Sequence, residues 1–267
     1  MAALELSYRV ETHRLAAPFR ISGYVFETSD VVVVELSDGQ FTGRGEAAGV
    51  YYLNDDSAHI VAELDAHRGV IESAADREKL LQLMPRGGAR NAVDCALWDL
   101  EAKREGTDAL SIARIGKARP LVTTFTLGAD DPQVMAEGAR RYATAQAIKV
   151  KLTGELELDI ERVGAIRAAR PDVWLGVDAN PGFTRNDLDR LVDALSTHRV
   201  SLLEQPLKRG SEADLEGYRC PIPIAADESA LGIDDVPGLV GRFDVINIKL
   251  DKCGGLTEAL LIADEAR

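Results

Sequence analysis

The chain is poor in the features that mark several common classes of protein. Among 267 residues it has only three cysteines and four histidines, with no Cys-x-x-Cys pair, so neither a zinc site nor a disulfide framework is indicated. Scarce, scattered thiols favour a reducing, cytoplasmic setting. No apolar run reaches the ~18 residues that span a bilayer, and the N-terminus does not resemble a signal peptide. We therefore expect a cytoplasmic protein without a membrane partner.

Positive charge is also scarce, with 31 Lys and Arg against 44 Asp and Glu and a net charge of -13. Binding to nucleic acid depends on neutralising phosphates with Lys and Arg, so we expect no nucleic-acid partner. The glycines form neither a Rossmann nor a P-loop signature, which removes the support for a nucleotide-binding fold. The negative charge by itself selects no substrate.

The first part of the chain has an α+β pattern. Residues 31–47 predict two strands joined by a Ser-Asp-Gly turn, while residues 56–74 and 90–106 predict helices. The pattern changes in the Gly-Lys-Ala-Arg-Pro stretch that follows. We therefore expect one domain over residues 1–118 and a second over residues 119–267.

In the second part, short apolar strands alternate with amphipathic helical stretches. This alternation predicts βαβ units and a parallel sheet. The six predicted strands cover residues 121–128, 147–152, 173–180, 200–206, 222–229 and 243–252. A closed barrel of eight βα units would need about 50 residues more. We therefore expect this sequence to be part of a longer protein, with a TIM-type (β/α) barrel interrupted after about six strands.

One ionisable residue stands near the carboxyl end of each of five consecutive predicted strands. These residues are Lys151, Asp178, Glu204, Asp227 and Lys249. They recur at roughly the length of one βα unit, which is about 30 residues in a barrel. Active sites of such barrels lie at the carboxyl ends of the strands. The spacing therefore predicts that these five side chains converge on one site.

The three acids in this series predict a metal site. A single Asp at a strand end is usually a cap or a turn residue. Three carboxylates from successive strands, however, repel one another unless a cation lies between them. Oxygen ligands favour Mg2+, with Mn2+ as an alternative, over zinc. We expect Asp178, Glu204 and Asp227 to hold one such ion.

The lysines predict proton transfer at a carbon atom. Lys151 and Lys249 end strands four apart, which oppose each other in an eight-stranded barrel, so one could remove a proton and the other return it on the opposite face. Lys149 points the same way as Lys151, because alternate strand residues share a face. A neighbouring cation lowers the pKa of a lysine. We therefore interpret Lys149 as an assisting residue and Lys151 as a base, although two solvated lysines on an edge strand are the simpler alternative.

The motifs IKVKL, VDAN, LEQPL, ADES and NIKLDKCGGLTEAL resemble the muconate-lactonizing subgroup of the enolase superfamily, and within it the dipeptide epimerases of the L-Ala-D/L-Glu type. The resemblance implies an α+β capping domain over a modified TIM barrel. It also implies a metal-stabilised enediolate, with a lysine base as its partner. By the same resemblance, Asn180 and Glu228 lie beside the metal ligands. Lys252 is basic and close to the site, but a structural role is its simpler interpretation.

Two stretches of the predicted cap are candidates for substrate recognition. PFRISGYVFETSD contains Tyr24 and Phe26, and GVYYLNDD contains Tyr51. Thr126, on the first barrel strand, is a further candidate. The resemblance implies an arginine near Gly23 for Ala-Glu substrates, and an Asp-x-Asp motif at an eighth strand for the substrate ammonium group. Gly23 and Tyr24 stand about where that arginine is expected, so we predict a dipeptide with a bulkier or apolar second residue. No region that could carry the Asp-x-Asp motif follows the six predicted strands, so this support for a dipeptide substrate is missing. Packing between cap and barrel is the alternative role for the aromatic side chains.

Other functions remain open at this point. A muconate cycloisomerase or an o-succinylbenzoate synthase would use the same acids and lysines with a single base. A non-catalytic metal-binding relic of an enzyme is an alternative of another class. Homo-oligomer formation also stays open, because nothing in the sequence decides it.

Overall fold

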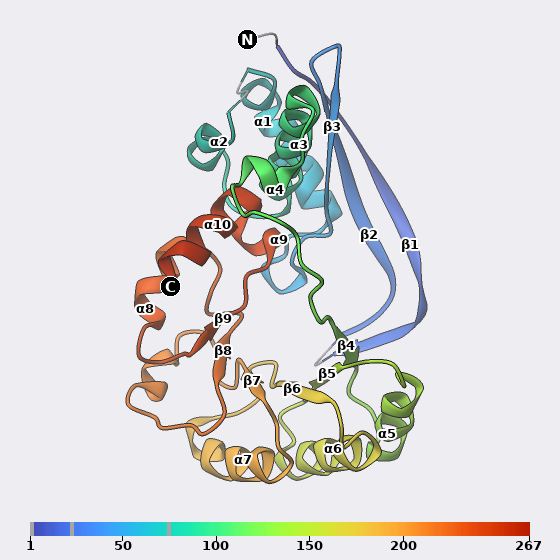
Figure 1. Cartoon of the computed structure of the whole chain (residues 1–267), viewed down its shortest axis with the longest axis vertical. Coiled ribbons are helices and arrows are strands. Elements are labelled where there is room, and N and C mark those ends of the chain that lie inside the picture. Colours follow the sequence, from blue (N-terminus) through green and yellow to red (C-terminus); the bar gives the residue numbers. More distant parts are fainter. Residues whose placement is uncertain (1–2, 22–23, 74–75) are drawn as a thin grey trace.

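The protein consists of a cap and a barrel-like part, which lie at the top and the bottom of Figure 1. The computed structural model describes residues 3–21, 24–73 and 76–267, without the side chains at positions 17, 20, 21 and 24. One sheet belongs to each part. Among the described residues, no helix has both the length and the apolar character needed to cross a membrane.

The cap sheet is antiparallel, in the order β1-β2-β3. Its strands are β1 (Glu5–Ile21), β2 (Tyr24–Ser37) and β3 (Thr42–Ala47). The predicted strand pair at residues 31–47 is confirmed, and Asp38 closes its turn by accepting hydrogen bonds from the backbone N–H groups of Gln40 and Phe41. The long strand β1 was not predicted, because charged and polar side chains interrupt its apolar residues.

In the described part of the cap, four α-helices and one 3-10 helix accompany the sheet. They are η1 (Tyr51–Leu53), α1 (Ser57–Ser73), α2 (Arg77–Leu83), α3 (Gly88–Glu105) and α4 (Ala109–Ile112). Both predicted helices are present as α1 and α3. Helix α3 packs so closely on β3 that a Cβ atom at Gly45 would lie 1.9 Å from the carbonyl oxygen of Ala92. Only glycine allows this approach, and it places α3 between the cap sheet and the barrel.

The second sheet is parallel and its six strands follow one another in chain order. They are β4 (Thr124–Leu127), β5 (Ala147–Lys151), β6 (Trp174–Asp178), β7 (Leu202–Glu204), β8 (Ile224–Ala226) and β9 (Val245–Ile246). All six predicted strands are confirmed, but they end earlier than predicted. Asn180 and Gln205 have positive φ angles of 47° and 40° and turn the chain out of the sheet.

Helices connect these strands, and two more follow the last strand. They are α5 (Pro132–Arg141), α6 (Leu156–Ala169), α7 (Arg185–Thr197), η2 (Glu212–Leu215), η3 (Ile233–Asp235), α8 (Val236–Leu239), α9 (Leu250–Cys253) and α10 (Leu256–Glu265). The core between sheet and helices contains fully buried Ile148, Val150 and Leu175. The other face of the sheet borders a cavity and carries Trp174, which is 39% exposed, and Lys149 in the middle of β5. This face therefore offers a position for polar chemistry in addition to the strand ends.

Candidate active site

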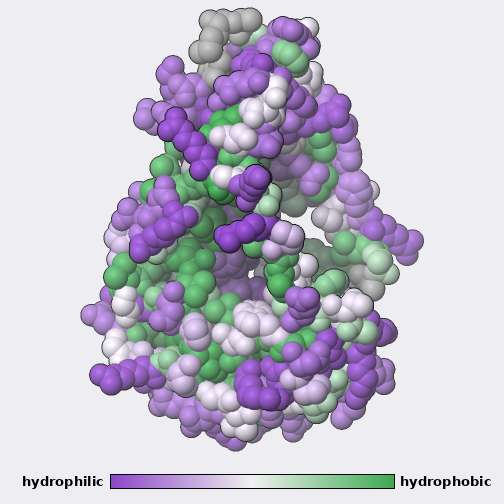
Figure 2. Space-filling view, in the orientation of Figure 1, coloured by the Kyte–Doolittle hydropathy of each residue, from purple (hydrophilic) through white to green (hydrophobic). Residues whose placement is uncertain are grey.

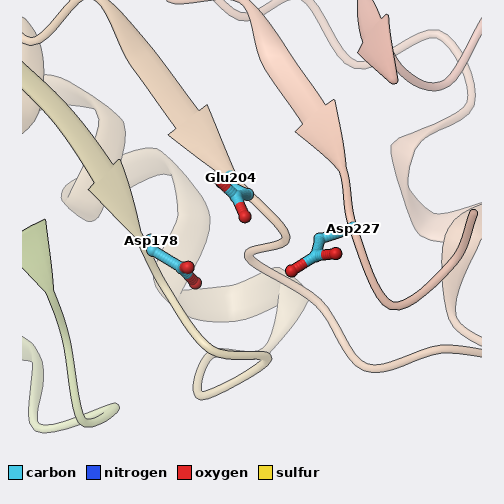
Figure 3. A group of neighbouring side chains, drawn as sticks. All are labelled: Asp178, Glu204 and Asp227. Atoms are coloured by element: carbon cyan, nitrogen blue, oxygen red, sulfur yellow. The ribbon is translucent and has the colours of Figure 1, made fainter. Parts of the chain in front are cut away.

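Three buried carboxylates lie at the carboxyl ends of neighbouring strands. Parallel pairing sets Asp178 opposite both Lys151 and Glu204, and Asp227 follows directly after β8. Figure 3 shows the three acidic side chains pointing toward one another, and oxygen atoms from all three lie within 4.8 Å of each other. Their exposure is 0%, 4% and 1% in chain order, so they have almost no contact with solvent. The predicted acids therefore form one cluster.

The predicted catalytic lysines lie at opposite ends of this cluster. Lys151 Nζ donates to Asp178 Oδ2 at 2.6 Å, and Lys249 Nζ donates to Asp227 Oδ2 at 2.5 Å. Strands β6, β7 and β8 separate the two lysines. A small molecule held at the acids would thus have one lysine on each side.

Lys149 does not face Lys151 as an isolated cation. Its Nζ lies 2.8 Å from Asp178 Oδ2 and 2.7 Å from Glu204 Oε2. Burial favours the neutral amine, but the two carboxylates outweigh burial and raise the pKa of Lys149. The charge of Lys149 is therefore compensated by Asp178 and Glu204. The sequence pattern indicates only its repulsion of Lys151.

Lysine neighbours decide the charge state of the acids. Burial opposes ionisation of Asp227, yet Lys249 and Lys252 hold its pKa at about 2. Burial likewise opposes ionisation of Asp178, whose pKa is lowered by Lys149 and Lys151. For Glu204, burial and then the charge of Asp178 raise the pKa. The cluster thus carries negative charge that nearby cations compensate, and its oxygen-only donor set fits Mg2+.

Lys252 contacts the cluster more closely than its sequence context suggested. It is only 1% exposed, and its Nζ donates to the Asp227 carbonyl oxygen and to Oδ1, each at 2.6 Å. Burial lowers its pKa, although Asp227 acts in the opposite direction. Lys252 therefore holds both the backbone and the side chain of a candidate metal ligand.

Two polar residues near the acids were missed in the sequence. Gln205 Oε1 accepts from the backbone N–H groups of Asp227 and Ser229, at 2.8 and 3.2 Å. Asn247 Nδ2 donates to Glu204 Oε1 at 2.9 Å. Gln205 belongs to the LEQPL motif, and its position beside a strand-end acid was the only available signal. Gln205 thus holds the backbone of the acid on the adjacent strand end, and Asn247 reaches from the end of β9 across β8 to the acid on β7.

Asn180 and Glu228 lie beside the acids and line a cavity of about 380 Å³ together with Tyr51 and Tyr52. The buried Asn180 Oδ1, Glu228 Oε2 and Tyr52 hydroxyl have no hydrogen-bond partner among the described residues. Burial, followed by the charge of Asp227, raises the pKa of Glu228 to about 7. Buried polar atoms are normally paired, so these atoms fit a site that receives a polar ligand.

A larger cavity of about 1120 Å³ lies between the cap strands and β4, and Phe26, Tyr51 and Thr126 line it. Figure 2 shows an opening between cap and barrel on the side of β1 and β2. The ring of Tyr51 contacts those of Phe26 and Tyr52 edge-on, with centroids 5.6 and 5.2 Å away. Tyr51 borders both cavities. The predicted Tyr24 side chain, like Gly23, lies outside the described residues.

Comparisons with known proteins cover almost the whole chain. Residues 4–112 match the N-terminal domain of the mandelate racemase / muconate lactonizing enzyme family, and residues 134–267 match an enolase C-terminal domain-like family. The L-Ala-D/L-Glu epimerase of Escherichia coli is 39% identical over 96% of this chain and 80% of that protein. A hydrophobic dipeptide epimerase of Enterococcus faecalis is 32% identical over 98% of this chain and 78% of its own length.

Solved structures agree with these matches. An enolase family member from Agrobacterium tumefaciens, with bound sodium and L-Ala-L-Glu, has a TM-score of 0.91 and 38% identity over 98% of this chain and 80% of its own. The dipeptide epimerase of Enterococcus faecalis, complexed with Mg and L-Leu-L-Tyr, has a TM-score of 0.94 and 30% identity over 99% and 79%. The predicted cap and barrel-type fold is confirmed, and this chain belongs to the mandelate racemase and muconate lactonizing enzyme family of the enolase superfamily.

Proposed function

We propose that the protein is an isomerase, a magnesium-dependent dipeptide epimerase that inverts the α-carbon of the C-terminal residue. The observation that carries this proposal is the placement of Lys151 and Lys249 at the two ends of one row of buried acids. Inversion at carbon needs a proton donor on the face opposite the base, and this arrangement supplies one. The printed names of its relatives, which include several dipeptide epimerases, support the same reaction.

Asp178, Glu204 and Asp227 would hold the Mg2+ ion. When bound, the ion stabilises the negative charge that develops on the substrate carboxylate as the α-proton leaves. Gln205 and Lys252 fix the backbone and the side chain of Asp227, and Asn247 orients Glu204. Mn2+ has similar ligand preferences and would be the first alternative ion.

The two lysines would divide the proton transfers between them. For one epimer, neutral Lys151 takes the α-proton and the Lys249 ammonium group delivers a proton to the opposite face. For the other epimer, the roles are exchanged, so each lysine serves as acid and as base. Lys149 stays charged beside Asp178 and Glu204 and assists by compensating their negative charge.

The second residue of the dipeptide would lie against the cap. Phe26 and Tyr51 form an aromatic wall, and Thr126 lines the cavity on the barrel side. Tyr24 stays a proposed substrate-binding residue on the ground of the sequence alone. We propose a preference for a bulky or apolar second residue over glutamate. In this proposal, residues 1–118 supply specificity and residues 119–267 supply the chemistry. A cytoplasmic location and a homo-oligomeric state remain predictions.

Exchange of the α-proton tests this function directly. The protein is incubated in D2O with Mg2+ and a library of L,L-dipeptides, and mass spectrometry follows the mass gain. We expect a gain of one deuterium together with inversion, stronger for L-Ala-L-Phe than for L-Ala-L-Glu, and loss of inversion in Lys151→Ala. Absence of exchange would instead direct attention to cycloisomerase or dehydratase substrates. Mg2+ binding without exchange or turnover of any of these substrates would fit the non-catalytic metal-binding relic.

A further inference from the structure

Helix α9 begins directly after Lys249 and lies between the cap and the rest of the barrel, beside α3 and α10 (Figure 1). It has a single turn, from Leu250 to Cys253, and Lys249 is its N-cap residue. One isolated turn has no stability of its own in water. The position of Lys249 therefore depends on the contacts that hold α9 in place.

Side-chain contacts tie α9 to the acid cluster and, at two places, to α3 of the cap. Lys252 Nζ binds Asp227 and so ties the helix to the acid cluster. Arg90, on α3, donates to the carbonyl oxygens of Cys253 and Gly254 at 2.6 and 3.2 Å. Asp251 Oδ1 accepts from Asn91 Nδ2 at 2.7 Å.

The contact between Asp251 and Asn91 extends to β3, the strand that leads into the loop over residues 48–56, which carries Tyr51. Asn91 Nδ2 also donates to the carbonyl oxygen of Glu46 at 3.3 Å, and Glu46 is the second-last residue of β3, just before that loop. Burial raises the pKa of Asp251, while hydrogen bonds from Asn91 and from the backbone N–H groups of Ala48 and Gly49 act in the opposite direction. One carboxylate thus faces the end of β3, the helix α3 and the first residues of the loop.

The loop itself is closed and anchored. Val50 pairs with Asp55 across it, and Asp55 Oδ2 accepts from the backbone N–H of Gly88 at 2.7 Å. At Gly49, with φ of 76°, a Cβ atom would lie 2.0 Å from the carbonyl oxygen of Asp55. Tyr51 therefore stands on a compact loop, and a displacement at its base would move the whole loop.

We infer that Asp251 is a positioning residue that fixes the loop carrying Tyr51 relative to Lys249. The inference rests on the proposed function, in which Lys249 acts on one face of the substrate and the loop contacts the side chain of the substrate. Lys151 has no comparable tie, since no side-chain hydrogen bond joins β5 to the cap among the described residues. Loss of Asp251 should therefore affect the two faces of the reaction unequally.

Asp251→Ala and Asp251→Asn test this inference, with Thr257→Val as the matched control. Thr257 Oγ1 donates to Asp94 at 2.5 Å, so the control also removes a contact between cap and barrel, but on α10 instead of α9. The first readout is hydrogen–deuterium exchange of peptides that cover residues 48–56. We expect faster exchange in both Asp251 variants and wild-type protection in Thr257→Val.

The second readout separates the two faces. Solvent exchange of the α-proton is measured for each epimer of one dipeptide, and Lys151→Ala and Lys249→Ala assign a lysine to each epimer. We expect proton loss to Lys249 to fall by about 10-fold or more in the Asp251 variants, because small misplacements of a reacting group are costly. Proton loss to Lys151 should stay near wild type, while inversion slows in both directions.

Equal slowing on both faces, or unchanged protection of residues 48–56, would overturn the inference. If the wild-type protein exchanges no α-proton from any dipeptide, the proposed function fails on its own. The deuterium exchange of residues 48–56 needs no turnover, so it still decides whether Asp251 holds the loop.

Discussion

The barrel and the cap contribute to the site by different physical means. In the barrel, the register of parallel strands places charges side by side, as in the row formed by Lys151, Asp178 and Glu204. In the cap, Phe26 and Tyr51 reach the site from a strand and a loop whose positions depend on contacts with other elements. A change in the barrel should therefore disturb charge balance, and a change in the cap should disturb recognition.

Lys252→Met should give the largest effect. Lys252 is almost fully buried and provides two hydrogen bonds of 2.6 Å to Asp227. Removing one partner of a buried ion pair costs about 3–5 kcal/mol, and because Lys249 stays beside Asp227 we expect a loss toward the lower end of this range. Urea denaturation without metal measures the loss, and Mg2+ should reduce it by compensating Asp227. Lys208→Met, at an exposed position, is the control, and equal stability of the two variants would contradict the expectation.

Gln205→Leu should have the next largest effect. It removes the acceptor for two buried backbone N–H groups, those of Asp227 and Ser229. An unsatisfied buried donor costs about 1–3 kcal/mol, and loss of a residue that orients metal ligands weakens metal binding by about 10–100-fold. Denaturation and calorimetric titration with Mg2+ measure both quantities. Gln146→Leu, exposed and remote from the acids, should change neither, and an unaltered Mg2+ affinity in Gln205→Leu would show that Gln205 does not orient Asp227.

The barrel could be predicted from sequence because its chemistry repeats along the chain. Each strand is a short apolar run with its ionisable residue at the same end, so spacing alone brings Asp178, Glu204 and Asp227 together. The partners of these acids do not repeat. Gln205 and Lys252 act through contacts between successive strand ends. Both lie after a strand has ended, and a sequence pattern does not show in which direction the loop there points their side chains.

The cap was less predictable, because its contacts do not repeat along the chain either. Its helices α1 and α3 follow helical periodicity, but the link from Asn91 to Asp251 joins residues far apart in the chain. The strand β1 was missed because charges such as Arg9 and Glu11 break its apolar alternation. Recognition surfaces built from such long-range contacts require the structure.

Tyr51→Ala tests recognition by the cap. Tyr51 borders both cavities and is 38% exposed, so its removal should enlarge the substrate site with little loss of stability. We expect kcat/KM for L-Ala-L-Phe to fall by about 10-fold, because loss of apolar contact in a specificity pocket is worth about 1–3 kcal/mol. Leu83→Ala, at an exposed position on α2, is the control. A larger loss for L-Ala-L-Glu than for L-Ala-L-Phe would argue against an aromatic wall for apolar residues.

His59→Gln should give the smallest effect, and one that depends on pH. His59 Nδ1 lies 3.0 Å from Asp55 Oδ1, and this hydrogen bond raises the pKa of His59. A raised pKa in the folded state means that protonation stabilises the fold. The contribution is complete below the ordinary histidine pKa of about 6.5 and is lost as the pH rises through the folded value.

The side chain of His59 is 54% exposed, so solvent screening should keep its contribution below about 1 kcal/mol. Thermal unfolding of the wild type and His59→Gln at pH 5 and pH 8 measures it, with the wild type favoured more at pH 5. Because Asp55 also anchors the loop through Gly88, loop protection at residues 48–56 should follow the same pH trend. If wild type and His59→Gln differ in stability by the same amount at pH 5 and pH 8, protonation of His59 does not stabilise the fold.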